Sequence, residues 1–228
     1  MKKHLFTYSI ILFILFLIFT LGLTTIDVVA IGPNQSMVGF SRLNQVIHSA
    51  IGVNMTWYHI TDWMGLVPIA IGLVYGFVGL IQWIRRRKIL LVDPHLLVLG
   101  LFYIIVFLVY LFFEFVIINY RPILINGYLE ASYPSSTTML ACTFLGTSID
   151  QTNRFIRSKK IEFVLFTLSI VLMIIMVGGR IISGVHWISD IIGSLLLSGS
   201  LLTLYYGVAS LTDKPKAKNH LYKKAPIE

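Results

Sequence analysis

Long uninterrupted runs of apolar residues constrain this chain more than any other feature of its sequence. Hydrophobic residues occupy 57% of the 228 positions, and charged residues occupy only 12%. A helical run of about 20 apolar residues matches the thickness of the hydrocarbon core of a bilayer. The sequence therefore predicts an all-α membrane protein, a bundle of six transmembrane helices. The six predicted spans are Phe6–Val29, Trp63–Trp83, His95–Asn119, Ser136–Ile149, Phe163–Gly178 and Trp187–Val208.

The fourth predicted span is the shortest and the most polar of the six. It contains four threonines, whose hydroxyl groups would be costly against lipid. We expect the other helices to shield this span from the bilayer. The four are Thr137, Thr138, Thr143 and Thr147.

The first apolar run follows Met1-Lys2-Lys3, as a secretory signal would. It continues to about Ala30, which is too long for the apolar region of a signal peptide, and residues 27–30 form a poor cleavage site. We interpret residues 1–30 as the first membrane helix. Residues 31–62 are predicted to be an extracytoplasmic interfacial segment with a short amphipathic helix. A membrane core over 63–211 and a basic cytoplasmic tail over 212–228 complete the chain.

Basic residues follow the predicted spans unevenly, and fifteen of the eighteen fall on one side of the membrane. Because cytoplasmic loops are rich in Lys and Arg, both termini are predicted to be cytoplasmic in a multi-pass protein of a bacterial plasma membrane. Topology thus accounts for the net charge of +8 without a nucleic-acid partner. The basic tail would anchor this topology or contact anionic lipids. The fifteen are Lys2, Lys3, Arg85, Arg86, Arg87, Lys88, Arg154, Arg157, Lys159, Lys160, Lys214, Lys216, Lys218, Lys223 and Lys224.

Arg42, Arg121 and Arg180 are the basic residues predicted on the outer face. Arg121 and Arg180 close the third and fifth spans, where an arginine can extend its charge to the interface. Their planar guanidinium groups also suit phosphate oxygens. The single cysteine, Cys142, excludes an internal disulfide and a cysteine-based metal site.

Three outer segments carry residues suited to phosphate chemistry. Arg121-Pro122 ends the third span, and Pro134-Ser135-Ser136-Thr137 opens the fourth, where backbone N–H groups and the Ser135 hydroxyl favour an anion. His186 and Asp190 are four residues apart, so on a helix they share one face. Asp190 could then accept the Nδ1 hydrogen and leave Nε2 free as a nucleophile or base.

These segments resemble the three motifs of the type-2 phosphatidic acid phosphatase (PAP2) superfamily. The family motifs read Lys-x6-Arg-Pro, Pro-Ser-Gly-His and Ser-Arg-x5-His-x3-Asp. Residues 179–190 keep the arginine, histidine and aspartate of the third motif at both spacings, while Arg121-Pro122 and Pro134-Ser135 keep parts of the other two. The resemblance covers about residues 60–210.

The resemblance implies a fold with the motifs at the extracytoplasmic face and a lipid-phosphate phosphatase without metal or cofactor. By it, His186 would attack phosphorus to form a phosphohistidine, and Asp190 would orient the imidazole. Arg121, Arg180 and Ser135 would hold the phosphoryl oxygens, with Ser136 beside them at the substrate. The substrate would be a lipid mono- or diphosphate such as phosphatidic acid, phosphatidylglycerol phosphate or undecaprenyl pyrophosphate.

The chain departs from the family at three motif positions. Glu114 stands at the lysine of the first motif, Thr137 at the histidine that protonates the leaving group, and Gly179 at the serine of the third motif. Loss of a general acid typically costs about 10²–10⁴-fold in rate. Glu114 could be a substitute acid if an apolar setting kept it protonated, or the structural partner of an arginine. His48 or His59 could also fold over the site as the acid.

Two functions therefore compete. The first is an enzyme that hydrolyses a lipid phosphate through His186. The second is a catalytically weak or inactive family member that binds lipid phosphates or regulates a membrane process. A transporter is disfavoured, because the sequence shows no inverted repeat and no paired broken helices. The lipid and the oligomeric state stay open.

Overall fold

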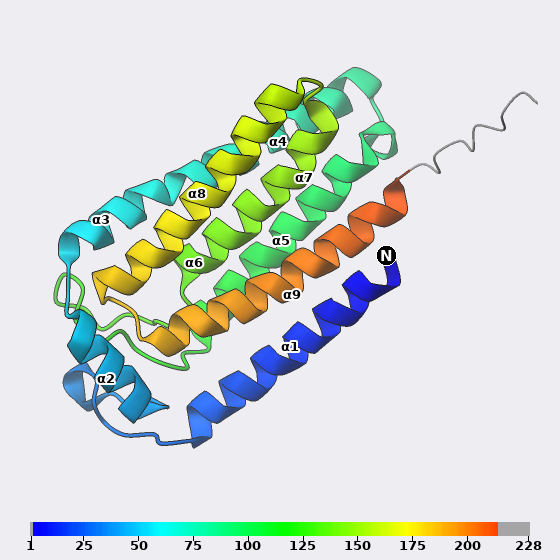
Figure 1. The fold of residues 1–228 in the computed structure, drawn as a ribbon. Helices are drawn as coiled ribbons and strands as arrows, with labels where there is room; N and C mark the ends of the chain where they lie inside the picture. Colours follow the sequence, from blue (N-terminus) through cyan, green and yellow to red (C-terminus); the bar gives the residue numbers. More distant parts are fainter. Residues whose placement is uncertain (1, 214–228) are drawn as a thin grey trace, which may run out of the picture.

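The computed structural model describes residues 2–213, and this part of the chain forms helices and loops without a β-strand (Figure 1). Within residues 2–213, five helical segments are long and apolar enough to cross a membrane, which confirms the predicted class of helical membrane bundle. The five are α1 (Lys2–Thr25), α3 running into α4 (Met55–Met64 and Leu66–Arg86), α5 (Pro94–Phe115), α8 (Lys159–Ser183) and α9 (Ile188–Thr212). The shorter elements outside the fourth predicted span are η1 (Pro33–Gln35), α2 (Ser41–Ile51) and η2 (Ile89–Leu91).

The fourth predicted span is a helix in three consecutive pieces. These are α6 (Ser136–Leu140), a π-helical turn η3 (Ala141–Leu145) and α7 (Gly146–Phe155). Most of its polar side chains, including Thr143, Thr147 and Gln151, are buried, whereas Ser136 and Thr137 at its start are half-buried. The expected shielding is thus confirmed, whereas the sixth membrane crossing itself stays a prediction.

Several predicted span boundaries differ from the structure by four residues or more: α1 ends at Thr25 rather than Val29, α7 ends at Phe155 rather than Ile149, and α8 covers Lys159–Ser183 rather than Phe163–Gly178. The second span begins at Met55 rather than Trp63, because the Asn54 side chain accepts a hydrogen bond from the Trp57 backbone N–H and caps α3. Residues 55–62 are therefore helical and continuous with the membrane core. The third span ends at Phe115, well before Pro122, where the β-branched run Val116-Ile117-Ile118 leaves the helix.

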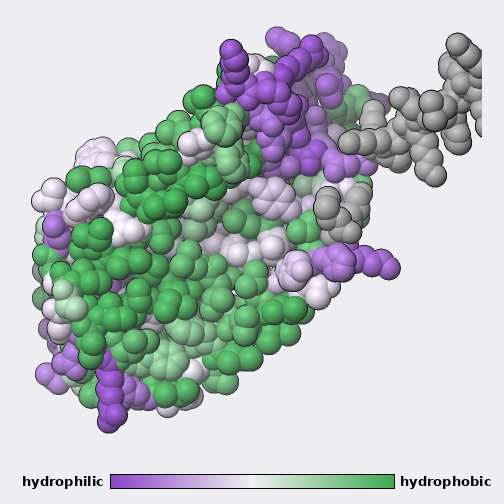
Figure 2. Space-filling view, in the orientation of Figure 1, coloured by the Kyte–Doolittle hydropathy of each residue, from purple (hydrophilic) through white to green (hydrophobic). Residues whose placement is uncertain are grey.

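The two ends of the described chain lie at the same end of the bundle (Figure 1). The α4–α5 and α7–α8 connections, with their arginines and lysines, lie at that end too. Figure 2 shows hydrophilic residues gathered there and at the opposite end, with a broad hydrophobic surface between them. The predicted lysine tail beyond residue 213 lies outside the described residues.

Small residues on α9 let α1 pack closely against it. Ser9 and Ser200 exchange hydrogen bonds, each hydroxyl donating to the backbone carbonyl of the other residue at 2.9 Å. The Phe6 ring lies against Gly207, where a Cβ atom would stand only 3.1 Å from it. Close approach through Gly and Ser is the usual means of helix association in membranes.

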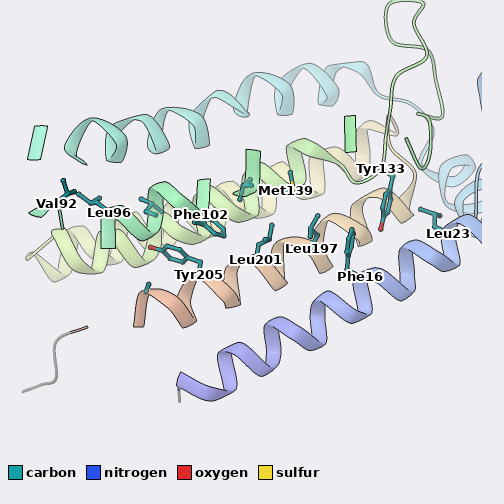
Figure 3. Close-up of a cluster of buried hydrophobic side chains, with 13 residues drawn as sticks. Phe16, Leu23, Val92, Leu96, Phe102, Tyr133, Met139, Leu197, Leu201 and Tyr205 are labelled. Atoms are coloured by element: carbon teal, nitrogen blue, oxygen red, sulfur yellow. The ribbon is translucent and has the colours of Figure 1, made fainter. Parts of the chain in front are cut away.

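Tyr133 ties the loop between α5 and α6 to this core (Figure 3). Its ring stacks on Phe16 with centroids 6.2 Å apart, and its hydroxyl is 2.6 Å from the Thr20 hydroxyl. A Cβ atom on Gly193 would lie 2.3 Å from the ring, so α9 accepts Tyr133 only because residue 193 is glycine. The loop that carries Ser132 and Pro134-Ser135 is thereby held in place.

Gly179 sets the distance between α8 and α3. A Cβ atom at this position would lie 2.4 Å from Thr61 Cγ2 and 3.0 Å from the Trp57 ring. Side chains of both helices would have to move to admit even an alanine. The neighbouring Gly178 has no atom within 4 Å of its Cβ position.

Gly179→Ala should therefore lower the thermal stability of the protein in detergent, by about 1–3 kcal/mol as for other overpacked sites. Gly178→Ala is the matched control, and it should be neutral or slightly stabilising because alanine favours the helix by up to about 1 kcal/mol. Equal melting temperatures for the two variants would contradict the close α3–α8 contact.

Candidate active site

The buried guanidinium group of Arg180 joins three helices at the end of the bundle away from the chain termini. Arg180, in the last turn of α8, is only 1% exposed. Its Nη2 donates to Asp62 Oδ1 on α3 at 3.0 Å and to Thr137 Oγ1 on α6 at 2.6 Å. The Tyr58 ring centroid lies 5.1 Å from the guanidinium carbon. Within residues 2–213, its Nε and Nη1 have no hydrogen-bond partner.

Unpartnered buried N–H groups of this kind are unfavourable and rare. The positive charges of Arg180 and Arg121 lie close enough to act on each other and on the His186 ring. Arg180 thus carries buried, unpartnered donors close to Arg121 and His186, and donors of this type suit anionic oxygen atoms.

His186 and Asp190 are linked through the hydroxyl group of Ser132. Ser132 Oγ donates to Asp190 Oδ2 and lies 3.0 Å from His186 Nδ1, whereas Nδ1 and Oδ2 are 3.6 Å apart. The prediction that Asp190 accepts the Nδ1 hydrogen directly is thus wrong. His186 precedes α9, whose first turn contains Asp190, so the two residues do not share a helix face. The turn that leads from His186 into α9 leaves space for the Ser132 hydroxyl group between the two side chains.

The Ser132 bridge decides which nitrogen of His186 carries the proton. A serine hydroxyl has one hydrogen, and here it goes to Asp190, so Nδ1–H must be the donor to Ser132 Oγ. The lone pair of the imidazole then lies on Nε2, which faces Arg121 Nη1 at 3.3 Å. Burial lowers the pKa of His186 well below its ordinary value of 6.5, and the positive charges of Arg121 and Arg180 lower it further. The imidazole is therefore neutral and nucleophilic at pH 7.

Arg121 reaches the site from a loop rather than from a helix end. Its backbone N–H donates to the Glu130 carbonyl at 3.1 Å, and Ser132 N–H donates to Asn119 O at 2.9 Å, so residues 119–132 fold back on themselves. The Arg121 guanidinium lies 3.0 Å from the Glu130 carboxylate. Glu130, and not Glu114, is thus the carboxylate partner of this arginine.

A cavity of about 570 Å³ opens in front of these residues. Its walls combine His186 and Arg121 with acidic, hydroxyl and aromatic side chains. Its lining comprises Tyr58, Asp62, Tyr110, Phe113, Glu114, Ile117, Arg121, Leu129, Glu130, Ala131, Ser132, Tyr133, Pro134, Ser136, Met139 and His186.

Among the predicted residues of the second motif, Ser136 lines this cavity and Ser135 does not. Ser135 is fully buried as the N-cap of α6, where its Oγ donates to Thr138 Oγ1 at 3.1 Å. Thr137 is held by Arg180 and lines a second, apolar cavity of about 330 Å³. The two cavities share Tyr110, Ser136 and Met139, so they adjoin.

Glu114, near the end of α5, is exposed to the main cavity. Its role as a substitute acid stays a prediction. His48 Nε2 instead lies 3.0 Å from the Gly184 carbonyl, and the His59 ring packs on Tyr58. Neither imidazole lines the main cavity, so neither gains support as the acid.

Ser132, Asp62 and Glu130 were not predicted from the sequence. The sequence could have indicated Asp62 and Glu130, because a buried arginine on the outer face needs a carboxylate nearby as its counter-ion. Few carboxylates fall on that side of the chain. Ser132 has no comparable signal, since its role depends on where the 119–132 loop folds.

Residues 69–212 match the model of the PAP2 superfamily, which is more than half of the chain. The fold is similar to the crystal structure of a transmembrane PAP2 type phosphatidylglycerolphosphate phosphatase from Bacillus subtilis, with a TM-score of 0.59 and 18% sequence identity. That similarity covers 91% of this chain and 98% of the other. Among curated proteins, none matches the sequence.

The environment of His186 predicts a proton titration that NMR of histidine-labelled protein can follow, with His186→Asn identifying the signal. Since burial is the main cause of the lowered pKa, the imidazole should stay neutral at pH 5.5, where an ordinary histidine is mostly protonated. Arg121→Gln should move the titration upward, because it removes a neighbouring positive charge. Titration near pH 6.5 in both proteins would contradict the described burial.

Proposed function

Because the chain belongs to the PAP2 superfamily, we propose that it is a membrane lipid phosphatase that hydrolyses a lipid mono- or diphosphate through a phosphohistidine at His186. The observation that carries the proposal is the Asp190–Ser132–His186 chain, which leaves the Nε2 lone pair facing Arg121 at the cavity. A nucleophile oriented by a second group, which is itself oriented by a third, is the usual arrangement for covalent catalysis.

The reaction would proceed in two displacements. The Nε2 lone pair forms a bond to phosphorus, the bond between phosphorus and the leaving oxygen of the lipid alcohol or lipid monophosphate breaks, and that oxygen takes up a proton from water or from an acid at the cavity. Water then attacks phosphorus, the phosphorus–nitrogen bond breaks, and phosphate leaves while the electron pair returns to Nε2. In the first step the Nδ1–H, held by Ser132 and Asp190, stabilises the positive charge that develops on the ring.

The two arginines would hold the phosphoryl oxygens during both steps. Arg180 offers its unpartnered Nε and Nη1, and Arg121 Nη1 can turn from His186 to an incoming oxygen. Charge-assisted hydrogen bonds of this type strengthen as negative charge grows on the transferred group. Ser136, at the cavity wall, is the further substrate contact that we propose.

A lipid substrate is supported by the apolar cavity that adjoins the site. It is lined by Ile69, Val106 and Phe107 among others, on the helices α4 and α5. An acyl or prenyl chain entering there would leave the phosphate at the polar cavity. Phosphatidic acid, phosphatidylglycerol phosphate and polyprenyl diphosphates all combine a terminal phosphate with an apolar chain. The Bacillus subtilis neighbour is itself a phosphatidylglycerolphosphate phosphatase.

The positive-inside rule supports an orientation with both termini in the cytoplasm and the site at the extracytoplasmic face. The basic connections lie at the end of the bundle opposite the cavity, as this orientation requires (Figures 1 and 2). We propose a plasma-membrane protein that acts on lipids of the outer leaflet.

A second candidate function is favoured by Thr137, which cannot replace the histidine that protonates the leaving group in the family. Its hydroxyl accepts a hydrogen bond from Arg180. A protein with a nucleophile but no efficient acid would bind lipid phosphates and hydrolyse them slowly, and would suit a regulatory role.

Phosphate release from a panel of lipid mono- and diphosphates tests the proposal, with purified protein in detergent and His186→Ala beside it. We expect turnover that falls to the background rate in the variant, because no other described side chain near the cavity offers an oriented imidazole. Turnover that survives in His186→Ala would contradict the proposed nucleophile.

Thr137→His, assayed on the same panel, separates the two functions. If the chain lacks an acid, the added imidazole should raise turnover by about 10²–10⁴-fold. A gain of less than about threefold, from a wild type that is already active, would identify an enzyme with its own acid and exclude the purely binding role.

A further inference from the structure

The carboxyl group of Asp62 lies beside the position at which the family motif has its acid histidine. That position is Thr137 in this chain. Nη2 of Arg180 donates to Thr137 Oγ1 at 2.6 Å and to Asp62 Oδ1 at 3.0 Å. Two acceptors of the same nitrogen are close neighbours. A group that can carry a proton therefore stands next to the threonine, which cannot replace the histidine.

Asp62 faces the main cavity, whereas Thr137 does not. Asp62 lines this cavity together with His186 and Arg121. Its side chain is 58% exposed, and within residues 2–213 only its Oδ1 is paired. The second carboxyl oxygen of Asp62 is thus free to contact a ligand that lies between it and the proposed nucleophile.

The close contact between α3 and α8 explains how Asp62 reaches this place. A Cβ atom on Gly179 would lie 2.4 Å from Cγ2 of Thr61, the residue before Asp62 on α3. Because α3 lies so near α8 at this point, the Asp62 carboxyl group can pair with the buried Arg180. The departures from the family motifs at residues 179 and 137 therefore lie around one carboxyl group.

The other titratable groups of the cavity lack this placement. Glu130 is paired with Arg121 at 3.0 Å, and the polar neighbour of Glu114 is the Tyr110 hydroxyl group. Within residues 2–213, no hydrogen bond or salt bridge joins either glutamate to Thr137 or Arg180. The Tyr58 ring lies over the Arg180 guanidinium, but a phenol is a far weaker acid than a carboxyl group.

We infer that Asp62 is the general acid of the phosphatase and takes the place of the histidine that the second motif lacks. The inference rests on the proposed function and adds the proton donor that the function needs. The proton enters with the substrate, because a phosphate monoester loses its second proton only near pH 6. A carboxylate and a phosphate in one site share such a proton, since two adjacent negative charges are unfavourable.

In the first step Asp62, having taken this proton, gives it to the leaving oxygen. The bond between Nε2 of His186 and phosphorus forms, the bond from phosphorus to the lipid oxygen breaks, and the alcohol leaves neutral. In the second step the Asp62 carboxylate takes a proton from the attacking water, and the phosphorus–nitrogen bond breaks with its electron pair returning to Nε2. The proton passes to the released phosphate, and the carboxylate pairs again with Arg180.

Asp62→Asn tests the inference, because it keeps an oxygen acceptor for Arg180 and removes the group that carries the proton. Release of the alcohol in a single turnover is measured in detergent from hexadecyl phosphate and from 4-nitrophenyl phosphate. Hexadecanol leaves well only when it is protonated, whereas nitrophenolate is a weak base that needs no proton. We expect the variant to be slower by about 10²–10⁴-fold on hexadecyl phosphate and by less than about tenfold on 4-nitrophenyl phosphate.

Equal losses on the two substrates would overturn the inference, because they would show that Asp62 only holds Arg180 in place. The inference would also be overturned if the variant kept the wild-type rate on hexadecyl phosphate. The same dependence on the leaving group in Glu114→Gln, with Asp62→Asn unaffected, would assign the acid to Glu114 instead.

Thr137→His in the Asp62→Asn background provides a second test, because it returns a proton donor to the adjoining position. The double variant should release hexadecanol at least about 10²-fold faster than Asp62→Asn alone. A double variant as slow as Asp62→Asn would overturn the inference. Glu162→Gln is the control, since Glu162 is a carboxylate paired with Lys159 at the other end of the bundle, and it should leave both rates unchanged.

Failure of the inference is distinguishable from failure of the proposed function. If the wild-type protein releases alcohol from neither substrate, the phosphatase is refuted and the role of Asp62 with it. If the wild-type protein hydrolyses both substrates and Asp62→Asn shows no dependence on the leaving group, the role of Asp62 alone is refuted and the phosphatase stands.

Discussion

The burial of one positive charge, that of Arg180, organises the site end of this bundle. A guanidinium group removed from water is stable only when other groups replace its hydration. Asp62 and the Tyr58 ring from α3 and Thr137 from α6 do so in part, and they hold these two helices against α8. Nε and Nη1 remain free, and the oxygen atoms of a bound phosphate would give them the hydrogen-bond acceptors that they lack.

The helix α3 explains two of the departures from the family motifs together. It packs so tightly on α8 that Gly179 has no room for the family serine, and it brings Asp62 to Arg180 beside Thr137. Asp62 lines the cavity together with Glu114 and Glu130, so three carboxylates face it from distant parts of the chain.

Sequence alone predicted the parts of this structure that follow from short-range pattern. Apolar runs gave the helical membrane class, and the spacing of Arg180, His186 and Asp190 indicated side chains that do lie together. It failed where contacts join distant segments: Ser132 bridges His186 and Asp190 from 54 and 58 residues away. The buried position of Ser135, the early end of α5 and the helical form of residues 55–62 also depend on tertiary packing or capping, which hydropathy does not report.

The central claim is that His186 Nε2 forms a covalent bond to phosphorus, and trapping that intermediate tests it most directly. Wild-type protein would be mixed with a lipid phosphate carrying a radiolabelled phosphoryl group and quenched in alkali, where a phosphohistidine survives. The account predicts label on the peptide that contains His186, lost on mild acid treatment and absent from His186→Ala. Phosphate release without any labelled protein, or label that persists in His186→Ala, would contradict it.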